Sequence, residues 1–388
     1  MLRVEPSEDS SEDYQRMCRA YRAHGEADYS SIGSIEDALA RLERERRGTR
    51  VAGFPGLVVI VMFLFIGILA TACSGASVGL AFFRGKTVTI IVPHGPGGMN
   101  DYARAIAPYL QKYLPGSRVG VRNVVGEGGI VGKNQIFSSS PDGLTLGFST
   151  TAGSLFAEWA LQPSVRYRTE EFSYLGRVDA EAHVLVLSAA TSLRSLDDVR
   201  RAGRLSMGFA GLGGDDYYVA LMTAGLLGFK VDVHTEFKNM DEACYACVRG
   251  GVEAVLLSAS TLQPQIEAGT VIPIAVFQEE RLGSLPLVPS IFEKAPAAAR
   301  PVLKSIVEIY GLDRSFFAPP GLPEGRLAAL RGALDRAMAD PEFLENMRRL
   351  GRPIDYLPGA ATTALLGDIL SDRERIRQLV LEVERGRK

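Results

Sequence analysis

Short apolar runs alternate with longer amphipathic stretches over residues 86–388. Runs rich in Val and Ile predict buried strands, and stretches with apolar residues three or four apart predict helices. Strands are expected at 87–92, 118–124, 145–149, 183–188, 205–210, 231–237, 254–257, 272–277 and 307–312. Helices are expected at 100–114, 130–138, 196–202, 215–227, 240–249, 264–268, 323–339, 342–350 and 361–385. This alternation favours parallel or mixed sheets with helices on both faces.

The region of alternating elements is about 300 residues long, which is large for a single hydrophobic core, so two α/β lobes are expected. We expect residues 85–184 to begin lobe I and residues 185–305 to form lobe II. Residues 306–388 then return to lobe I and add the C-terminal helices. The hinge is predicted near residues 183–188 and 304–311.

A glycine-rich turn follows the first predicted strand. Gly95, Gly97 and Gly98 permit backbone angles that other residues avoid, and they let a ligand approach the main chain. Asn100 or Asp101 is expected to cap the helix that follows. The free amides at such a helix start favour a negative charge, so this turn predicts a site for a small anion.

Similar turns follow other predicted strands, at residues 125–129, 149–153 and 211–216. In open α/β sheets, ligands bind beyond the carboxyl ends of the strands. The chain has no G-x-x-x-x-G-K-[ST] loop, G-x-S-x-G elbow or H-E-x-x-H motif. We therefore expect a cleft that grips a ligand, with no catalytic residues, no metal and no cofactor.

The N-terminal part predicts a targeting segment. Residues 51–83 carry no charge and follow a run of arginines that includes Arg41, Arg47 and Arg50, so the C-terminal part is expected to be exported. Small residues before Cys73 resemble a lipoprotein processing site; the alternative is an uncleaved membrane anchor. Both alternatives predict a membrane-tethered protein in the periplasm or on the outer face of the cytoplasmic membrane. Residues 1–50 are a cytoplasmic tail or reflect a start codon placed too far upstream.

Composition and net charge limit the kinds of molecule that the protein is expected to bind. The net charge of −2 gives no general attraction to nucleic acid, and no basic stripe interleaved with aromatic residues is present. Cys244 and Cys247 form a C-x-x-C pair without a second pair to complete a zinc site. They are interpreted as small helix residues or a local disulfide.

Five motifs resemble one family in their order along the chain. A strand and V-P-[FY]-x-x-G-G-x-x-D match residues 92–101, and E-N-x-x-G-A-G-G-x-x-G matches 122–132. P-D-G-x-T-L matches 141–146, P-x-V-P-T matches 286–290, and F-A-P-x-G-x-P matches 317–323. The chain thus resembles the solute-binding receptors of tripartite tricarboxylate transporters, the TctC or Bug family, from about residue 86 to about residue 357.

The resemblance implies a two-lobed, type II-like Venus-flytrap fold with a ligand cleft between the lobes. It also implies a small carboxylate ligand, a dicarboxylate, tricarboxylate or amino-acid-like molecule, that is passed to membrane permease subunits. By position, the ligand-binding residues would be Gly97, Gly98, Met99, Asn100, Asp101, Gly128, Gly129, Ser149, Thr150, Thr151, Gly213, Gly214, Asp215, Asp216, Phe237 and Lys238. A receptor that signals to a membrane sensor remains the alternative.

The chain departs from the family's pattern in places that bear on the ligand. His94 stands where an aromatic residue is usual, and Arg122 where Glu is usual. Asp215 and Asp216 open a predicted helix that should face the cleft; they could simply cap it. Alternatively, one of them accepts hydrogen bonds from an ammonium or hydroxyl group of the ligand. On that hypothesis the ligand has a carboxylate at one end and an amine or polar group at the other.

Overall fold

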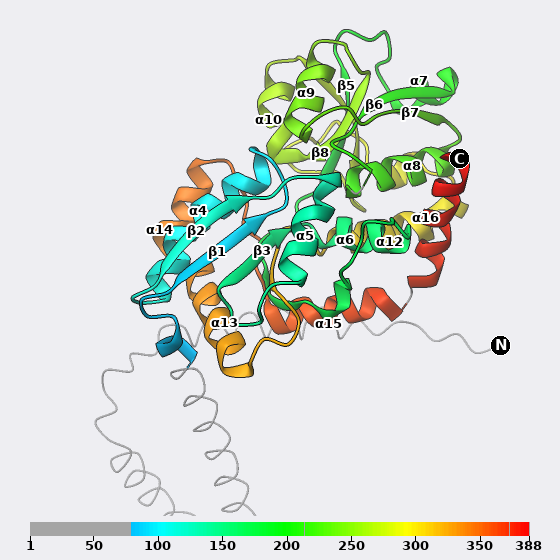
Figure 1. Cartoon of the computed structure of the whole chain (residues 1–388). Coiled ribbons are helices and arrows are strands. Elements are labelled where there is room, and N and C mark those ends of the chain that lie inside the picture. Colours follow the sequence, from blue (N-terminus) through cyan, green and yellow to red (C-terminus); the bar gives the residue numbers. More distant parts are fainter. Residues whose placement is uncertain (1–78, 213, 372, 388) are drawn as a thin grey trace, which may run out of the picture. The chain divides into compact units, whose positions relative to one another are not determined.

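The computed structural model describes residues 79–387, apart from 213 and 372. The chain divides into two units, Met1–Ile68 and Leu69–Lys388, and the described residues all belong to the second unit (Figure 1). The predicted extension 1–50, Cys73 and most of the uncharged segment 51–83 lie outside the described residues. Within the described part of the chain, no helix has both the length and the apolarity needed to cross a bilayer.

Six strands form the sheet of lobe I. Their order is β11 (Leu357–Pro358), β4 (Ser173–Arg177), β10 (Ser315–Ala318), β3 (Thr145–Ser149), β1 (Thr87–Val92) and β2 (Arg118–Asn123). β1 runs parallel to β2 and β3, whereas β10 is antiparallel to β3 and β4. Helices α4 (Gly98–Tyr113) and α13 (Glu324–Met338) pack together, and α4 also contacts β1 and β2. Val88, Ile90 and Val92 of β1 are buried against this layer.

Five strands form the sheet of lobe II, in the order β7 (Lys230–His234), β6 (Arg204–Gly208), β8 (Ala254–Ser258), β5 (His183–Ser188) and β9 (Val271–Phe277). β6 runs parallel to β7 and β8, and β5 is antiparallel to β8 and β9. The helices of this part are α7 (Leu196–Ala202), α8 (Asp215–Leu227), α9 (Met240–Val248) and α10 (Ala259–Glu267).

The chain crosses between the sheets twice. Residues 178–182 join β4 to β5, and the return passes through α11 (Ile291–Lys294) and α12 (Arg300–Tyr310) before β10. The prediction of a strand at 307–312 is wrong, because residues 307–310 end α12 and residues 311–312 form the turn after it. Leu303, Ile306 and Tyr310 recur at helical spacing and are buried on one face of that helix.

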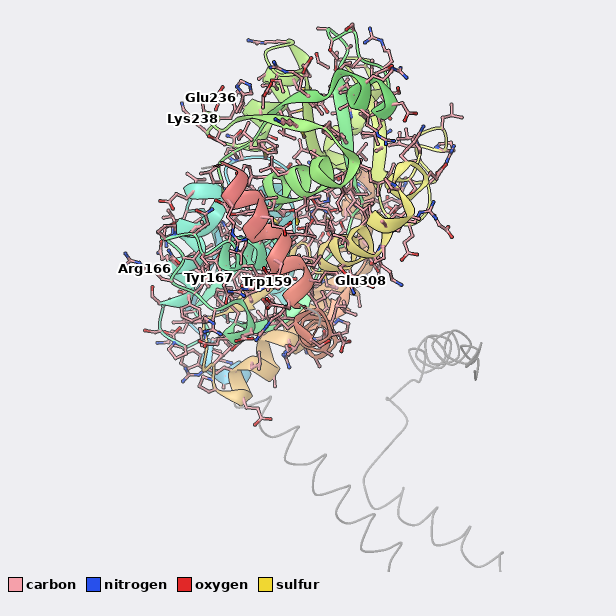
Figure 2. The ribbon with its side chains drawn as sticks, turned by 90° about the vertical axis from the view of Figure 1, so that its right-hand side faces the viewer. Trp159, Arg166, Tyr167, Glu236, Lys238 and Glu308 are labelled. Carbon is pink, nitrogen blue, oxygen red and sulfur yellow. The ribbon has the colours of Figure 1, made fainter. Side chains whose placement is uncertain are left out.

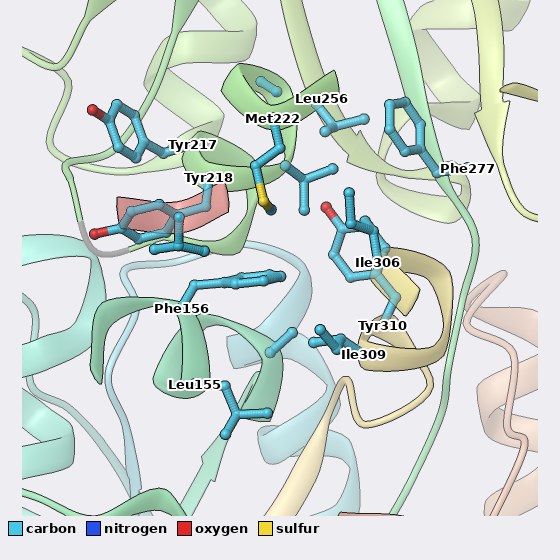
Figure 3. Packing of buried hydrophobic residues seen from close by; sticks show 14 of the residues in the cluster. Leu155, Phe156, Tyr217, Tyr218, Met222, Leu256, Phe277, Ile306, Ile309 and Tyr310 are labelled. Atoms are coloured by element: carbon cyan, nitrogen blue, oxygen red, sulfur yellow. The ribbon is translucent and has the colours of Figure 1, made fainter. Parts of the chain in front are cut away.

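One hydrophobic core includes residues of both lobes. Phe156 from α6 (Thr151–Trp159), Tyr218 from α8, and Ile306 and Tyr310 from α12 meet in it (Figure 3). The predicted helix 361–385 is in fact two helices, α15 (Gly359–Ser371) and α16 (Arg373–Arg387). α16 contacts α8, α6 and α12 (Figure 2). The lobes are therefore joined by packing at this face as well as by the crossing segments.

The remaining elements are short or lie at the edge of lobe I. They are α5 (Ile130–Phe137), α14 (Pro341–Arg349) and the single turns of 3-10 helix at Glu127–Gly129, Thr169–Glu171 and Ala297–Ala299. The sequence pattern missed β4, β10, β11, α6, α11 and α12.

Candidate functional site

A cavity of about 150 Å³ opens between the loops of the two lobes. Six described helices begin at its wall: α4, α5, α6, α8, α9 and α10. The first amides of a helix have no partner within the helix, and the helix dipole makes this end positive. In α4, α5, α8 and α10 the N-cap residue makes no side-chain capping bond. At α5 and α10 the first amides already donate within the protein, Gly129 N–H to the Gly126 carbonyl and Ser260 N–H to Glu181. The start of α4 is therefore the part of the wall whose amides favour an anion.

The glycine turn after β1 forms one wall. Gly97 has a φ of 125° and precedes the first residue of α4. Its missing side chain leaves room for Asp241 of α9, because a Cβ at this position would overlap the Asp241 carboxylate. Loop residues of lobe I and the start of α9 in lobe II are thus in direct contact across the cleft.

His94 lies within this wall. Its Nε2 is 2.9 Å from the Ser149 hydroxyl, and its carbonyl accepts a hydrogen bond of 2.7 Å from Asn123 Nδ2. Burial lowers the pKa of His94 to about 3, so the imidazole is neutral at physiological pH. His94 therefore orders the turn and adds no positive charge to it.

Asp215 and Asp216 form the acidic part of the opposite wall. Both are buried and occupy the first turn of α8, whose N-cap is Gly214. Asp215 Oδ2 lies 3.8 Å from Nε2 of His183, the residue that begins β5. Burial raises the pKa of Asp215, and burial together with the charge of Asp215 raises the pKa of Asp216 well above its usual value.

Lys133 is a buried cation in α5 beneath the cleft. Its Nζ has no hydrogen-bond partner among the described residues. Burial lowers the pKa of Lys133 to about 8, while the negative charges of Asp215 and Asp313 act in the opposite direction. Sequence inspection missed this residue because nothing in its neighbourhood marks it as buried.

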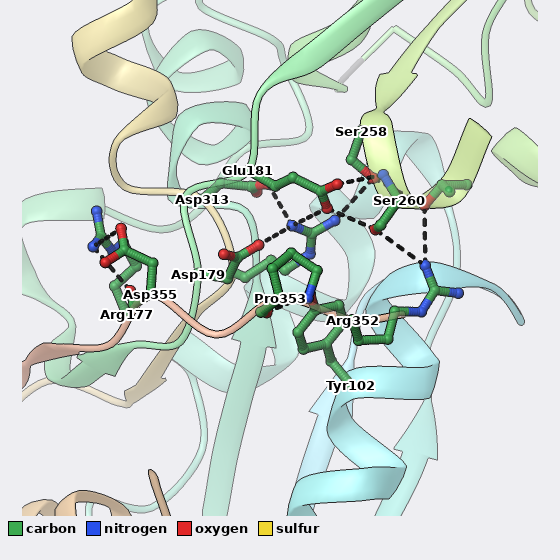
Figure 4. A network of polar contacts seen from close by, with 12 residues as sticks. Tyr102, Arg177, Asp179, Glu181, Ser258, Ser260, Asp313, Arg352, Pro353 and Asp355 are labelled. Atoms are coloured by element: carbon green, nitrogen blue, oxygen red, sulfur yellow. Dashed lines mark hydrogen bonds and ion pairs between the residues drawn. The ribbon is translucent and has the colours of Figure 1, made fainter. Parts of the chain in front are cut away.

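Arg314 lines the cavity and connects the crossing segments through a cluster that includes Asp179, Glu181 and Ser258, which Figure 4 shows close together. Its Nη1 lies 2.6 Å from Asp179 Oδ2 and 3.2 Å from Glu181 Oε2, and its Nη2 donates to the Ser258 hydroxyl at 2.9 Å. The backbone of Arg314 has a φ of 41°, which is uncommon for a residue with a side chain. Several contacts therefore hold the return segment, just before β10, in one conformation.

Arg352 makes a second bridge between the lobes. Its Nη2 lies 2.9 Å from Oδ2 of Asp101 on α4, and its Nη1 donates to the Ser260 hydroxyl on α10 at 3.3 Å. The Ser260 hydroxyl also donates to Glu181 Oε2 at 2.7 Å (Figure 4). Asp101 is therefore held by Arg352 instead of lining the cavity.

The structure brings most of the sequence-predicted site residues to the cavity. Its wall includes Gly97, Gly98, Met99, Gly128, Gly129, Thr150, Gly214, Asp215, Asp216 and Lys238. Lys238 is exposed beside Glu236 at the outer edge (Figure 2). Asn100, Asp101, Ser149, Thr151 and Phe237 do not line it, and Gly213 lies outside the described residues.

The excluded residues have other contacts. The Asn100 side chain accepts a hydrogen bond from Arg104 at 3.1 Å, and Phe237 packs over Gly208. Conversely, the sequence pattern did not single out the wall residues His183, Asn239, Asp241, Ser258, Thr261, Asp313 and Arg314. Asp313 and Arg314 could not have been found by pattern, since their partners are far away in the sequence.

The fold and the cleft define a class of protein: a two-sheet α/β periplasmic binding protein. The family described as Tripartite tricarboxylate transporter family receptor, TctC, matches residues 102–376, and this chain belongs to it. Members of this family are substrate-binding receptors and not enzymes. The proteins of this family are periplasmic binding proteins.

Curated relatives are similar at modest identity. The "UPF0065 protein in tcbD-tcbE intergenic region" of a Pseudomonas species is 27% identical over 324 residues, which cover 82% of this chain and 92% of that protein. Protein BugT of Bordetella pertussis is 28% identical over 236 residues, or 59% of this chain and 72% of BugT.

Solved structures share the fold. MatC from Rhodopseudomonas palustris with bound malate has a TM-score of 0.62 at 24% identity, covering 76% of this chain and 99% of MatC. An R. palustris protein with adipate has a TM-score of 0.61 at 19% identity, covering 76% and 97% of the two chains.

Proposed function

We propose that this chain captures a small carboxylate outside the cytoplasmic membrane and delivers it to the permease subunits of a tripartite tricarboxylate-type transporter. The observation that carries the proposal is the convergence of six helix starts on one cavity. Micromolar affinity requires about 8 kcal/mol, which several charge-assisted hydrogen bonds from preorganised amides can supply. The malate and adipate named for two structures of the same fold are small carboxylates, which is in keeping with this proposal.

Closure of the two lobes would complete the site. The carboxylate would lie against the start of α4, and the loops before α8 and α9 would cover it from lobe II. Contact between Gly97 and Asp241 is then a feature of the closed state, which a permease can distinguish from an open one.

Thermal unfolding of the full-length chain with a panel of mono-, di- and tricarboxylates tests the binding step. A ligand that binds only the folded state stabilises it by about 2.7 kcal/mol at a hundredfold excess over Kd. We expect a saturable rise in Tm with at least one small carboxylate. No rise with any of them, alongside a rise with an uncharged solute, would overturn the proposal.

Transport is tested separately from binding. Deletion of the gene should abolish uptake of the carboxylate that binds, and the intact gene should restore it. If the ligand instead changes transcription while its uptake persists without the receptor, the sensing alternative replaces transport.

We also propose that residues 51–83 tether the receptor to the membrane, through a lipid on Cys73 or as an uncleaved anchor. The support is the uncharged stretch after a run of arginines. Fractionation of cells that express the natural chain and Cys73→Ser distinguishes the two tethers. Loss of membrane association only in the variant favours the lipid, association of both favours the anchor, and release of both excludes a tether.

A further inference from the structure

Asp216 is a buried carboxylate that lines the cavity without a counter-ion. Its Oδ2 has no hydrogen-bond partner, and no ion pair involves it within the described part of the chain. Its other oxygen, Oδ1, lies against Gly214, where a Cβ would overlap it. The carboxylate is thus bonded by the amides of the helix start, while Oδ2 is buried without a partner of its own.

Among the described residues, no neighbouring cation forms an ion pair with Asp216. Asp215 is next to it on α8 and is 3.8 Å from His183 of β5. Lys133 of α5 is influenced by Asp215 and Asp313, and Arg314 pairs with Asp179 and Glu181. The Tyr310 hydroxyl of α12, which is itself buried without a hydrogen-bond partner, is influenced by Asp215, Asp216 and Asp313. Asp216 therefore depends on a proton or on a cation from outside the protein.

The wall of the cavity from lobe I favours an anionic group, whereas the wall from lobe II favours a cationic one. The start of α4 offers backbone amides at Gly98 and Met99, which favour an anionic group. At the start of α8, by contrast, the carboxylates of Asp215 and Asp216 stand in the first turn, bond its amides and reverse the local charge. A ligand with negative charge at both ends would place one end against these carboxylates.

We propose that Asp216, with Asp215 beside it, is the specificity-determining group of the cleft and binds a cationic nitrogen of the ligand. The ligand class is then a small zwitterion, with a carboxylate at one end and an ammonium at the other. This inference rests on the proposed function, because it assumes that the first wall holds a carboxylate.

Proton exchange follows from this arrangement. In the empty receptor, burial and mutual repulsion raise the pKa values of the two adjacent carboxyls, so the pair keeps a proton to higher pH than two exposed aspartates would. An incoming ammonium brings its own positive charge, so that proton passes to the buffer. A dicarboxylate would instead require the pair to keep its proton or to take up another.

Calorimetry of the full-length chain with matched probes tests the proposal. The probes are 4-aminobutanoate against succinate, and 5-aminopentanoate against glutarate, and the two members of each pair have the same number of carbons. We expect the natural chain to prefer a zwitterion by at least tenfold. Asp216→Asn, which keeps the side-chain shape, should lose that preference while binding the dicarboxylate equally well or better. Asp232→Asn, a change at a half-buried carboxylate on β7 that pairs with Arg204 and does not line the cavity, should keep it.

Proton release gives an independent readout. Titrations at neutral pH in two buffers with different ionisation heats should show proton release on zwitterion binding by the natural chain and none by Asp216→Asn. If Asp216→Asn shows no cooperative thermal unfolding and is therefore not folded, Asp216→Ser is used in its place. Preference for a dicarboxylate, or an unchanged preference in both variants, would overturn the inference and leave the proposed function intact. Failure of every carboxylate to bind would overturn both.

Discussion

Arg314 Nη1 lies 2.6 Å from Asp179 Oδ2, and this ion pair joins the return segment before β10 to the segment that links β4 with β5. Both side chains are buried. The two chain crossings between the lobes are therefore held together by a charged contact, which would set where any hinge motion takes place.

Replacing Arg314 with Gln should be strongly destabilising. The change leaves the buried Asp179 and the half-buried Glu181 without their cation, a situation that costs about 3–5 kcal/mol for a buried pair. Urea unfolding measures the difference. The double variant with Asp179→Asn should recover part of the loss, because it removes one unpaired charge. A single variant with unchanged unfolding free energy would show that this pair does not stabilise the fold.

Substituting Gly97 with Ala should weaken ligand binding more than it weakens the fold. The new methyl group occupies the space of the Asp241 carboxylate and keeps the lobes apart, and Ala also tolerates a φ of 125° poorly. Calorimetry and thermal unfolding separate the two effects. Adding Asp241→Ala relieves the overlap but not the backbone strain, so it should restore affinity in part. Equal affinity of Gly97→Ala and the natural chain would contradict the closed contact.

The acidic pair should make the empty receptor less stable as pH rises. The pKa values of Asp215 and Asp216 are raised in the folded state, so their contribution is fully present below the unfolded pKa of about 4. That contribution is lost as pH rises through the folded pKa. Tm measured from about pH 4 to 8 should therefore fall less steeply for Asp216→Asn than for the natural chain. Parallel curves would show that the pair is ionised without cost.

His94 should stay neutral throughout the physiological range, because burial lowers its pKa to about 3. Its imidazole resonances in the NMR spectrum should not titrate between about pH 5 and 8. His94→Phe loses the contact with the Ser149 hydroxyl and should cost about 1 kcal/mol. A His94 that titrates near its ordinary pKa would contradict this environment.

Cys244 and Cys247 are free and buried in the structure. Burial raises the pKa of these thiols to about 11 and about 12, so little thiolate is present at neutral pH. A thiol reagent should modify them only as fast as the chain unfolds. Rapid modification of the native protein, or a disulfide in its tryptic map, would contradict the buried thiol state.

Local sequence patterns correctly predicted the elements in which the apolar spacing and the flanking turn residues indicate the same limits. β1, β3, β5, α7 and α8 have the predicted limits, since each is a clear apolar run or a stretch between turn residues. α6 was missed because Thr150 and Thr151, taken for a turn, are its N-cap and first residue. Residues 307–310 were misread because Val307 and Ile309 favour a strand in isolation, whereas their place in α12 depends on packing against α6 and α16.

The part of the site that backbone groups form could be predicted from the sequence. Gly97, Gly98 and Gly129 belong to turns that only certain residues allow, so the sequence marks them directly. Lys133, His183 and Arg314 are placed by tertiary contacts between segments far apart in the chain. No local pattern distinguishes such residues from others of their type.

The most direct test follows the main-chain amides during binding. The full-length chain, labelled with nitrogen-15 at glycine, is titrated with a carboxylate that raises its Tm. The amide of Gly98 should shift most, while those of Gly203 and Gly269, which lie in turns away from the cavity, should not. Saturable binding without a shift at Gly98 would contradict the account that backbone nitrogens at the start of α4 hold the ligand.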